Sequence, residues 1–154
     1  MSVRNVVQQA VDNWGKVSGL EKRSGSWYRT NDEVISVSNL QKSQYGPSYY
    51  FNQAFWLRGL GDERYPKENK CHIRLRLGSL LGADAERLDQ LLDLDCAVPD
   101  IDRVVALAAI LTNQLLPVIE QGSSLFGLRS LLDEGVFKAA RIGGPAQHLL
   151  ASVS

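Results

Sequence analysis

The strand-like segments of this chain fall within one stretch, residues 26–78, and helical patterns lie before and after it. The clearest strand is at 71–78, where apolar and polar side chains alternate with a period of two. Its apolar positions are Ile73, Leu75 and Leu77, and its polar positions are His72, Arg74 and Arg76. Strands that follow one another without intervening helices pair in antiparallel fashion, and helices outside the strand region gather on one face. The sequence therefore predicts an α+β fold, an antiparallel sheet of about four strands with helices packed on one face.

The other strands are expected at 27–29, 34–41 and 49–57. In the second of these, Ile35 and Val37 alternate with serines, and Leu40 then breaks the alternation. A break of this kind indicates a bulge or the end of the strand.

Apolar residues at helical spacing predict helices near 3–14, 101–116 and 124–134, with a short one at 85–92. Ser2 is a candidate cap for the first helix. In the long helix, Ile101 and Val105 are expected to face inward with Val104, Ala108, Leu111 and Leu115. Gly143-Gly144-Pro145 interrupts the last pattern, so residues 142–154 are expected to form a weakly ordered tail of one domain spanning 1–154.

Composition places the chain among ordinary globular proteins, with 154 residues, 44% of them hydrophobic and 22% charged. It contains no run of about 18 apolar residues and no apolar signal-peptide core near residue 1, so we expect a cytoplasmic protein without a membrane span. Cys71 and Cys96 are then free thiols. With two histidines in the chain and no metal-spaced cluster, we expect no metal and no cofactor.

The net charge is zero, but the two halves differ. Residues 1–80 hold 12 Lys/Arg against 7 Asp/Glu, and residues 81–154 hold 5 against 10. The acidic excess is concentrated at 84–102, called here the acidic segment, which includes Asp89 and Asp93. Such a segment is either a solvated helix face or a docking patch for a basic partner. The neutral total disfavours a protein that wraps nucleic acid.

A sheet covered by helices on one side leaves its other face open, and the polar positions of the 71–78 strand project from that face. The candidate binding residues there are Asn39, Gln41, Lys42, Tyr50, Asn52, Trp56, His72, Arg74 and Arg76. Arginines beside amides and aromatic rings suit the recognition of carboxylate or phosphate groups. The alternative is a solvated sheet face without a ligand.

Catalytic patterns are scarce. No glycine-rich phosphate loop and no Gly-x-Ser-x-Gly motif occurs. Cys71 and His72 are adjacent, so in a strand they would point to opposite faces and could not form a nucleophilic pair. Cys71 is expected on the apolar face that carries Ile73, as a structural residue.

Several segments resemble an uncharacterised bacterial family, DUF4304, over about residues 3–120. They are Gly25–Arg29, Val37–Ser43, Cys71–Gly78 and Leu116-Pro117. The order of helix, aromatic-basic strand, "N-hydrophobic-Q-K-S" and "C-x-I-R-x-R" is similar to that of the family. The chain departs from the family after Gly78, where Leu91 and Leu92 stand in place of tryptophans. The resemblance implies a bacterial cytosolic protein and draws attention to Asn39, Gln41, Lys42, Arg74 and Arg76, but it implies no activity.

Two functions stay open from the sequence. The first is a non-enzymatic protein that binds a protein partner, a basic one if the acidic segment docks it, in the manner of an immunity or antitoxin-type inhibitor. The second is nucleotide or nucleic-acid binding through the Arg/Lys/aromatic sheet face. An unrecognised enzyme comes third.

Overall fold

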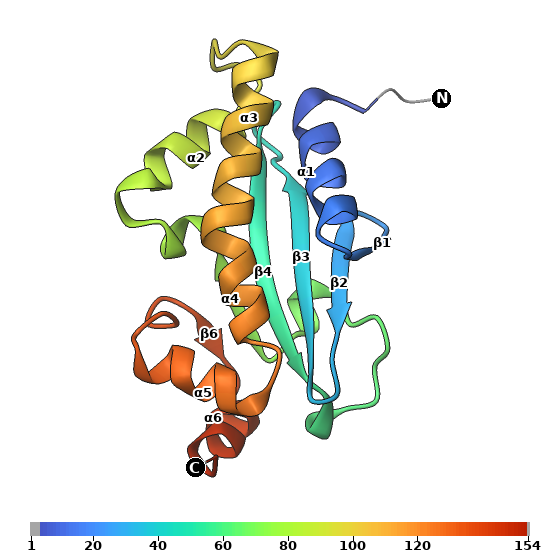
Figure 1. The fold of residues 1–154 in the computed structure, drawn as a ribbon, viewed down its shortest axis with the longest axis vertical. Helices are drawn as coiled ribbons and strands as arrows, with labels where there is room; N and C mark the ends of the chain where they lie inside the picture. Colours follow the sequence, from blue (N-terminus) through green and yellow to red (C-terminus); the bar gives the residue numbers. More distant parts are fainter. Residues whose placement is uncertain (1–3, 154) are drawn as a thin grey trace.

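A single antiparallel sheet, with helices along one of its faces, forms the centre of the computed structural model, which describes residues 4–153 (Figure 1). The strands are β1 Glu21–Arg23, β2 Ser26–Thr30, β3 Val34–Lys42, β4 Tyr49–Leu57, β5 Ile73–Arg76 and β6 Arg141–Ile142. They pair in the order β1-β2-β3-β4-β5-β6, and every pair is antiparallel. The α+β class is confirmed, with six strands in the described residues rather than about four.

The helices are α1 Val6–Val17, α2 Ala85–Leu91, α3 Asp100–Ile110, α4 Leu116–Gln121, α5 Leu125–Asp133 and α6 Gly144–Ala151. A π-helical turn at Leu111–Leu115 joins α3 to α4, so Asp100–Gln121 is one continuous helix. α1 and this long helix lie along the sheet, and α5 and α6 cover its lower end (Figure 1). Ser2 and Val3 lie outside the described residues. α1 begins at Val6, where Asn5 and Gln8 form a capping box.

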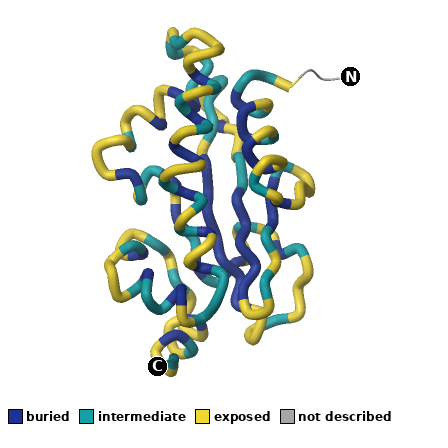
Figure 2. Tube along the Cα trace, in the orientation of Figure 1, coloured by how far each residue is buried: buried dark blue, intermediate teal, exposed yellow. Residues whose placement is uncertain are grey.

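The helix-covered face of the sheet holds the larger part of the core. Trp14 of α1 and Leu111 of the long helix belong to one buried cluster with Phe51 of the sheet. Leu128 of α5 belongs to a second one with Phe55 and Ile73. The predicted burial of the 71–78 strand is confirmed: Ile73, Leu75 and Leu77 are buried, and Arg74 and Arg76 are more exposed. In Figure 2 the buried positions run along the middle strands.

The opposite face also carries a small apolar cluster. Tyr28, Ile35, Val37, Ala54, Trp56 and Cys71 are buried there, and Tyr65 packs against them. β3 pairs with β4 without interruption from Val34 to Lys42, so neither the bulge nor the strand end expected at Leu40 occurs there. Leu40 simply faces the helices, whereas Ile35 and Val37 face this cluster. From Val34 to Ser38, β3 is buried on both faces, so apolar side chains can lie on either face and the alternation changes at Leu40.

Cys71 lies in that cluster and not on the face of Ile73, so its predicted side was wrong. β5 begins only at Ile73, because a 3₁₀ turn at Glu68–Lys70 ends the preceding loop. The Cys71 Sγ lies 3.4 Å from the Lys67 carbonyl oxygen, to which it donates. The residue is nevertheless buried, as a structural thiol should be.

Two helical expectations also need correction. Residues 142–153 are not a weak tail: Arg141–Ile142 pairs with β5, and Ala146 and Leu150 of α6 are fully buried. In α3, Ile101 and Val105 are exposed instead of facing inward. Arg103, which lies between them in the sequence, is buried. The buried side of the helix is the one that carries Leu107, Leu111 and Leu115.

Candidate functional site

The strand register aligns a row of polar side chains straight across the open face of the sheet. The row consists of Arg23, Ser26, Asn39, Asn52 and Arg76, each paired with the next across neighbouring strands. Four inter-strand steps of ~4.8 Å place its two terminal arginines about 19 Å apart at the backbone. Amide and hydroxyl groups therefore lie between two guanidinium groups on the face of the sheet that the helices do not cover.

Hydrogen bonds fix the amides at the centre of this row. Asn52 is buried, and its Nδ2 donates to Asn39 Oδ1 and to Gln41 Oε1, each at 3.0 Å. Asn39 Nδ2 in turn donates to Ser26 Oγ at 3.0 Å. Because each amide is held by its neighbour, the row presents a preformed pattern of donors and acceptors.

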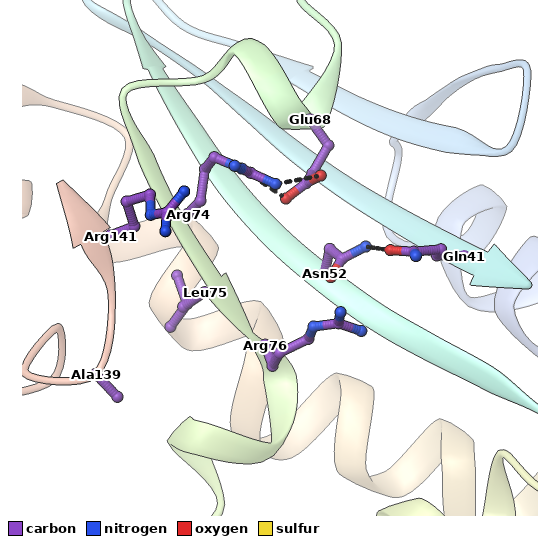
Figure 3. Close-up of a pocket in the computed structure, with 8 residues that line it drawn as sticks. All are labelled: Gln41, Asn52, Glu68, Arg74, Leu75, Arg76, Ala139 and Arg141. Carbon is purple, nitrogen blue, oxygen red and sulfur yellow. Dashed lines mark hydrogen bonds and ion pairs between the residues drawn. The ribbon is translucent and has the colours of Figure 1, made fainter. Parts of the chain in front are cut away.

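Three arginines, Arg74, Arg76 and Arg141, gather at the β5–β6 end of the row (Figure 3). Arg74 binds Glu68 through two atoms, with Nε–Oε1 at 3.1 Å and Nη2–Oε2 at 3.4 Å. The Arg76 guanidinium lies 4.1 Å from the centre of the Tyr50 ring. Arg141 stands beside Arg74 in the strand register. Among residues 4–153, neither Arg76 nor Arg141 has a carboxylate within ion-pair distance, so both charges are available to a ligand.

Two adjoining hollows lie on this surface, and together they are called the polar groove. One, of about 350 Å³, is lined by Gln41, Asn52, Glu68, Arg74, Leu75, Arg76, Ala139 and Arg141 (Figure 3). The other, of about 520 Å³, is lined by Arg23, Ser24, Ser26, Tyr28, Asn39, Gln41, Lys67, Glu68, Asn69 and Arg74. Five basic side chains and one carboxylate line the groove, a net charge of +4. Its chemistry is that of an anion-binding surface.

Of the predicted binding residues, the structure brings together Asn39, Gln41, Asn52, Arg74 and Arg76, with Tyr50 beneath the Arg76 guanidinium. Residues that sequence reasoning missed are Arg23, Lys67, Glu68 and Arg141. All four lie outside the strands, helices and tail that the sequence predicts, and no alternation pattern marks them.

Lys42, Trp56 and His72 lie outside the groove. Lys42 shares the helix-facing side of β3, and its Nζ donates to the carbonyl oxygens of Ser43 and Gly46 in the following turn. The rings of Trp56 and His72 stack at the other end of the sheet, 4.3 Å apart. His72 Nδ1 accepts from the Leu57 amide at 2.9 Å, and burial lowers the pKa of His72. These two aromatic side chains therefore stabilise the fold there.

The two acidic candidates lie on the helical side of the molecule. Asp89 is exposed on α2. Asp93 follows the end of α2, and its backbone pairs with that of Ser48 in an isolated antiparallel β-bridge. The Asp93 carboxylate accepts from the Asp95 amide at 2.9 Å. Neither residue lines the polar groove, so the acidic segment and the groove are separate surfaces.

Cys71 and His72 both lie outside the groove. Burial raises the pKa of the Cys71 thiol to about 12. Within the described residues, no three His, Cys, Asp or Glu side chains are close enough to hold a metal ion.

The family model for "Domain of unknown function (DUF4304)" matches residues 16–121. The chain belongs to this family. The DUF4304 match covers β1 to β5 and the long helix, and with them Arg23, Asn39, Asn52, Arg74 and Arg76. Arg141 and the helices α5 and α6 lie beyond it. The searches of curated proteins and of solved structures gave no match.

Proposed function

We propose that the polar groove binds a phosphate-bearing ligand, a nucleotide or a single strand of nucleic acid. The observation that carries this proposal is the meeting of Arg74, Arg76 and Arg141 at one hollow in which one carboxylate opposes them. Guanidinium groups bind phosphate oxygens through charge-assisted hydrogen bonds, each contributing about 1.5–3 kcal/mol.

The rest of the groove suits the non-phosphate parts of such a ligand. The stacked Tyr50 and Arg76 side chains provide planar groups against which a base can stack, and stacking tolerates any base. Gln41 is exposed, and its side-chain amide, held by the bond from Asn52 to its Oε1, can donate to a base edge. The groove runs across several strands, as in other sheets that bind single strands on an open face.

The test is a titration of the purified protein against a panel of mononucleotides and short single-stranded oligonucleotides at low and moderate salt. The double variant Arg76→Ala/Arg141→Ala removes two charges that have no carboxylate partner among residues 4–153, so the change in stability should be small. Loss of two contacts should weaken binding by roughly 10²–10⁴-fold. Arg87→Ala, an exposed arginine on α2, is the matched control and should bind as the wild type does.

Absence of binding to every nucleotide and oligonucleotide at low salt would overturn the proposal. An equal affinity for carboxylate-rich peptides would show that the groove recognises negative charge without preference for phosphate. Binding that falls with rising salt, and falls less steeply in the double variant, is the expected result.

A protein partner is a second candidate function, of the kind that an immunity or antitoxin-type inhibitor performs. The observation that favours it is the position of exposed acidic residues beside exposed apolar ones on the helical side.

A further inference from the structure

The long helix Asp100–Gln121 is more apolar than an outer helix of this fold requires. From Val104 to Ile119 it carries no charged side chain. Its most apolar 18-residue window has a mean hydropathy of 1.4, so by length and composition alone the helix could span a membrane. In the structure, 28% of that window is buried. Leu107, Leu111, Leu115 and Ile119 account for its contact with the core. The other side of the helix is left without a cover in residues 4–153.

That outer side has no charged side chain between Val104 and Ile119, whereas solvated helices are normally charged. Ile101 is 72% exposed and Val105 is 61% exposed, and the two lie one turn apart. Ala109, Thr112 and Pro117 continue the exposed side. These five residues are called the outer helix face. Ile101 and Val105 form its main apolar part, while Thr112 and the neighbouring exposed Asn113 are polar but uncharged. Neighbouring exposed apolar side chains, unlike a single one, mark an interaction surface.

Acidic side chains border one flank and one end of the outer helix face. α2 lies beside α3 (Figure 1), and Gln114 Nε2 of the long helix donates to Asp84 Oδ2 at 3.0 Å. The exposed acidic residues here are Asp84, Glu86, Asp89, Asp100 and Asp102. Arg87 is the one exposed basic residue among them, and Arg103 is buried with its guanidinium bonded to backbone carbonyls. The border therefore has a net charge of about −4.

We infer that the outer helix face docks an amphipathic helix of a partner protein, one with apolar residues at i, i+3/i+4 and i+7 flanked by Lys or Arg. This surface is distinct from the polar groove, and the inference gives the second candidate function its surface and its partner chemistry. Charge complementarity selects this occupant. A second copy would bring Asp100 and Asp102 against Glu120 in an antiparallel pair, or against themselves in a parallel pair, so like charges would oppose it. Anionic lipid headgroups would be repelled by the same residues.

The probe is a fluorescent Leu/Lys peptide of about five helical turns, with leucines on one side and lysines flanking them. A peptide of identical composition with scrambled order has the same charge but no apolar side. The protein should bind the ordered peptide at least about tenfold more tightly than the scrambled one. The double variant Ile101→Ser/Val105→Ser should lose this preference, because the apolar contact supplies it. Phe126→Ser on α5, where the side chain is 66% exposed, is the matched control and should keep it.

The charged border is tested separately. Asp89→Lys/Asp102→Lys should lower the association rate and flatten its dependence on salt, since charges at the edge of an interface act mainly on encounter. Equal binding of the ordered and scrambled peptides, or an equal loss in the Phe126 variant, would overturn the inference. A wild-type dimer that Ile101→Ser/Val105→Ser dissociates, or vesicle binding abolished by that variant, would also overturn it and name the true occupant. The Arg76→Ala/Arg141→Ala variant should bind the peptide normally, so failure here and failure of the polar groove are distinguishable.

Discussion

Arg103 joins the end of α2 to the start of α3, and its removal should destabilise the protein strongly. The side chain is 2% exposed. Its Nη1 donates to the carbonyl oxygens of Gln90, Leu91 and Asp93, and its Nη2 donates to that of Cys96 at 2.8 Å. Two of these carbonyls belong to the last turn of α2, where the helix dipole favours a positive charge.

The magnitude follows from which acceptors would lose their partner. Arg103→Met keeps most of the apolar stem but removes every donor. The bond to the Leu91 carbonyl is buried, so that oxygen would stay unsatisfied at a cost of about 1–3 kcal/mol. The other three carbonyls are partly buried, and water can replace part of what they lose. Arg103→Met should therefore lower the free energy of unfolding by about 3–5 kcal/mol, in the range found when one partner of a buried charged interaction is deleted.

Urea denaturation followed by tryptophan fluorescence measures this free energy, and for a chain of this size the melting temperature should fall by about 6–20 °C. Arg87→Met is the matched control and should change stability by less than ~0.5 kcal/mol. Arg103→Lys keeps the charge but not the forked donors, so the stability of this variant should lie between that of Arg103→Met and that of the wild type. A loss below about 1 kcal/mol in Arg103→Met would refute the reasoning, because it would mean that desolvation of the guanidinium cancels its four hydrogen bonds.

Three further changes have defined outcomes. Burial raises the pKa of Cys71 to about 12, so the folded thiol holds its proton longer than the unfolded one, and stability should fall between about pH 9 and pH 12. Cys71→Ala should lessen that slope, part of which remains because burial also raises the pKa of Tyr28. Iodoacetamide should label Cys96 first in the folded protein, as mass spectrometry would show. Burial lowers the pKa of His72, so the unfolded state takes up its proton first and stability should fall as pH drops below about 6.5; His72→Gln should lessen this fall in urea titrations. A Cβ on Gly127 would lie 1.7 Å from the Gln121 carbonyl oxygen, so Gly127→Ala should cost at least ~1–3 kcal/mol, whereas Gly59→Ala, with open space, should not.

The fold class could be predicted because alternation in β5 is a direct consequence of burial on one face. Ile73 and Leu75 are buried and Arg76 is exposed, as a period of two requires. The strands β1 and β6 were missed because three and two residues are too few to show any alternation. Their place in the sheet depends on pairing with residues elsewhere in the chain.

The buried side of α3 could not be read from its sequence for a different reason. The helix is apolar on two sides, so Ile101 and Val105 match a helical period as well as Leu107 and Leu111 do. Packing against the sheet and the π turn at Leu111–Leu115 decide which side is covered. The burial of Arg103 reverses the usual expectation, because backbone carbonyls there supply its partners.

The polar groove could be predicted only in part. Arg74 and Arg76 share a face by strand geometry alone. The alignment of Asn39 with Asn52, and of Arg141 with Arg74, requires the pairing register, which depends on turn geometry and on contacts across the chain. The arrival of Glu68 beside Arg74 depends on how the preceding loop folds back.

The two shortest strands form the two edges of the sheet, and this protects the chain from assembling into fibrils. β1 offers three exposed, charged residues, Glu21, Lys22 and Arg23, and β6 offers two residues before Gly143 and Pro145. An incoming strand from another molecule finds too few free backbone groups at either edge to be templated. The long apolar strands β3 and β4, which are the segments most able to stack into cross-β structure, lie inside the sheet, and their middle residues have a strand on both sides. Exposure of those strands requires the sheet itself to open, so resistance to fibril growth should last as long as the native fold does.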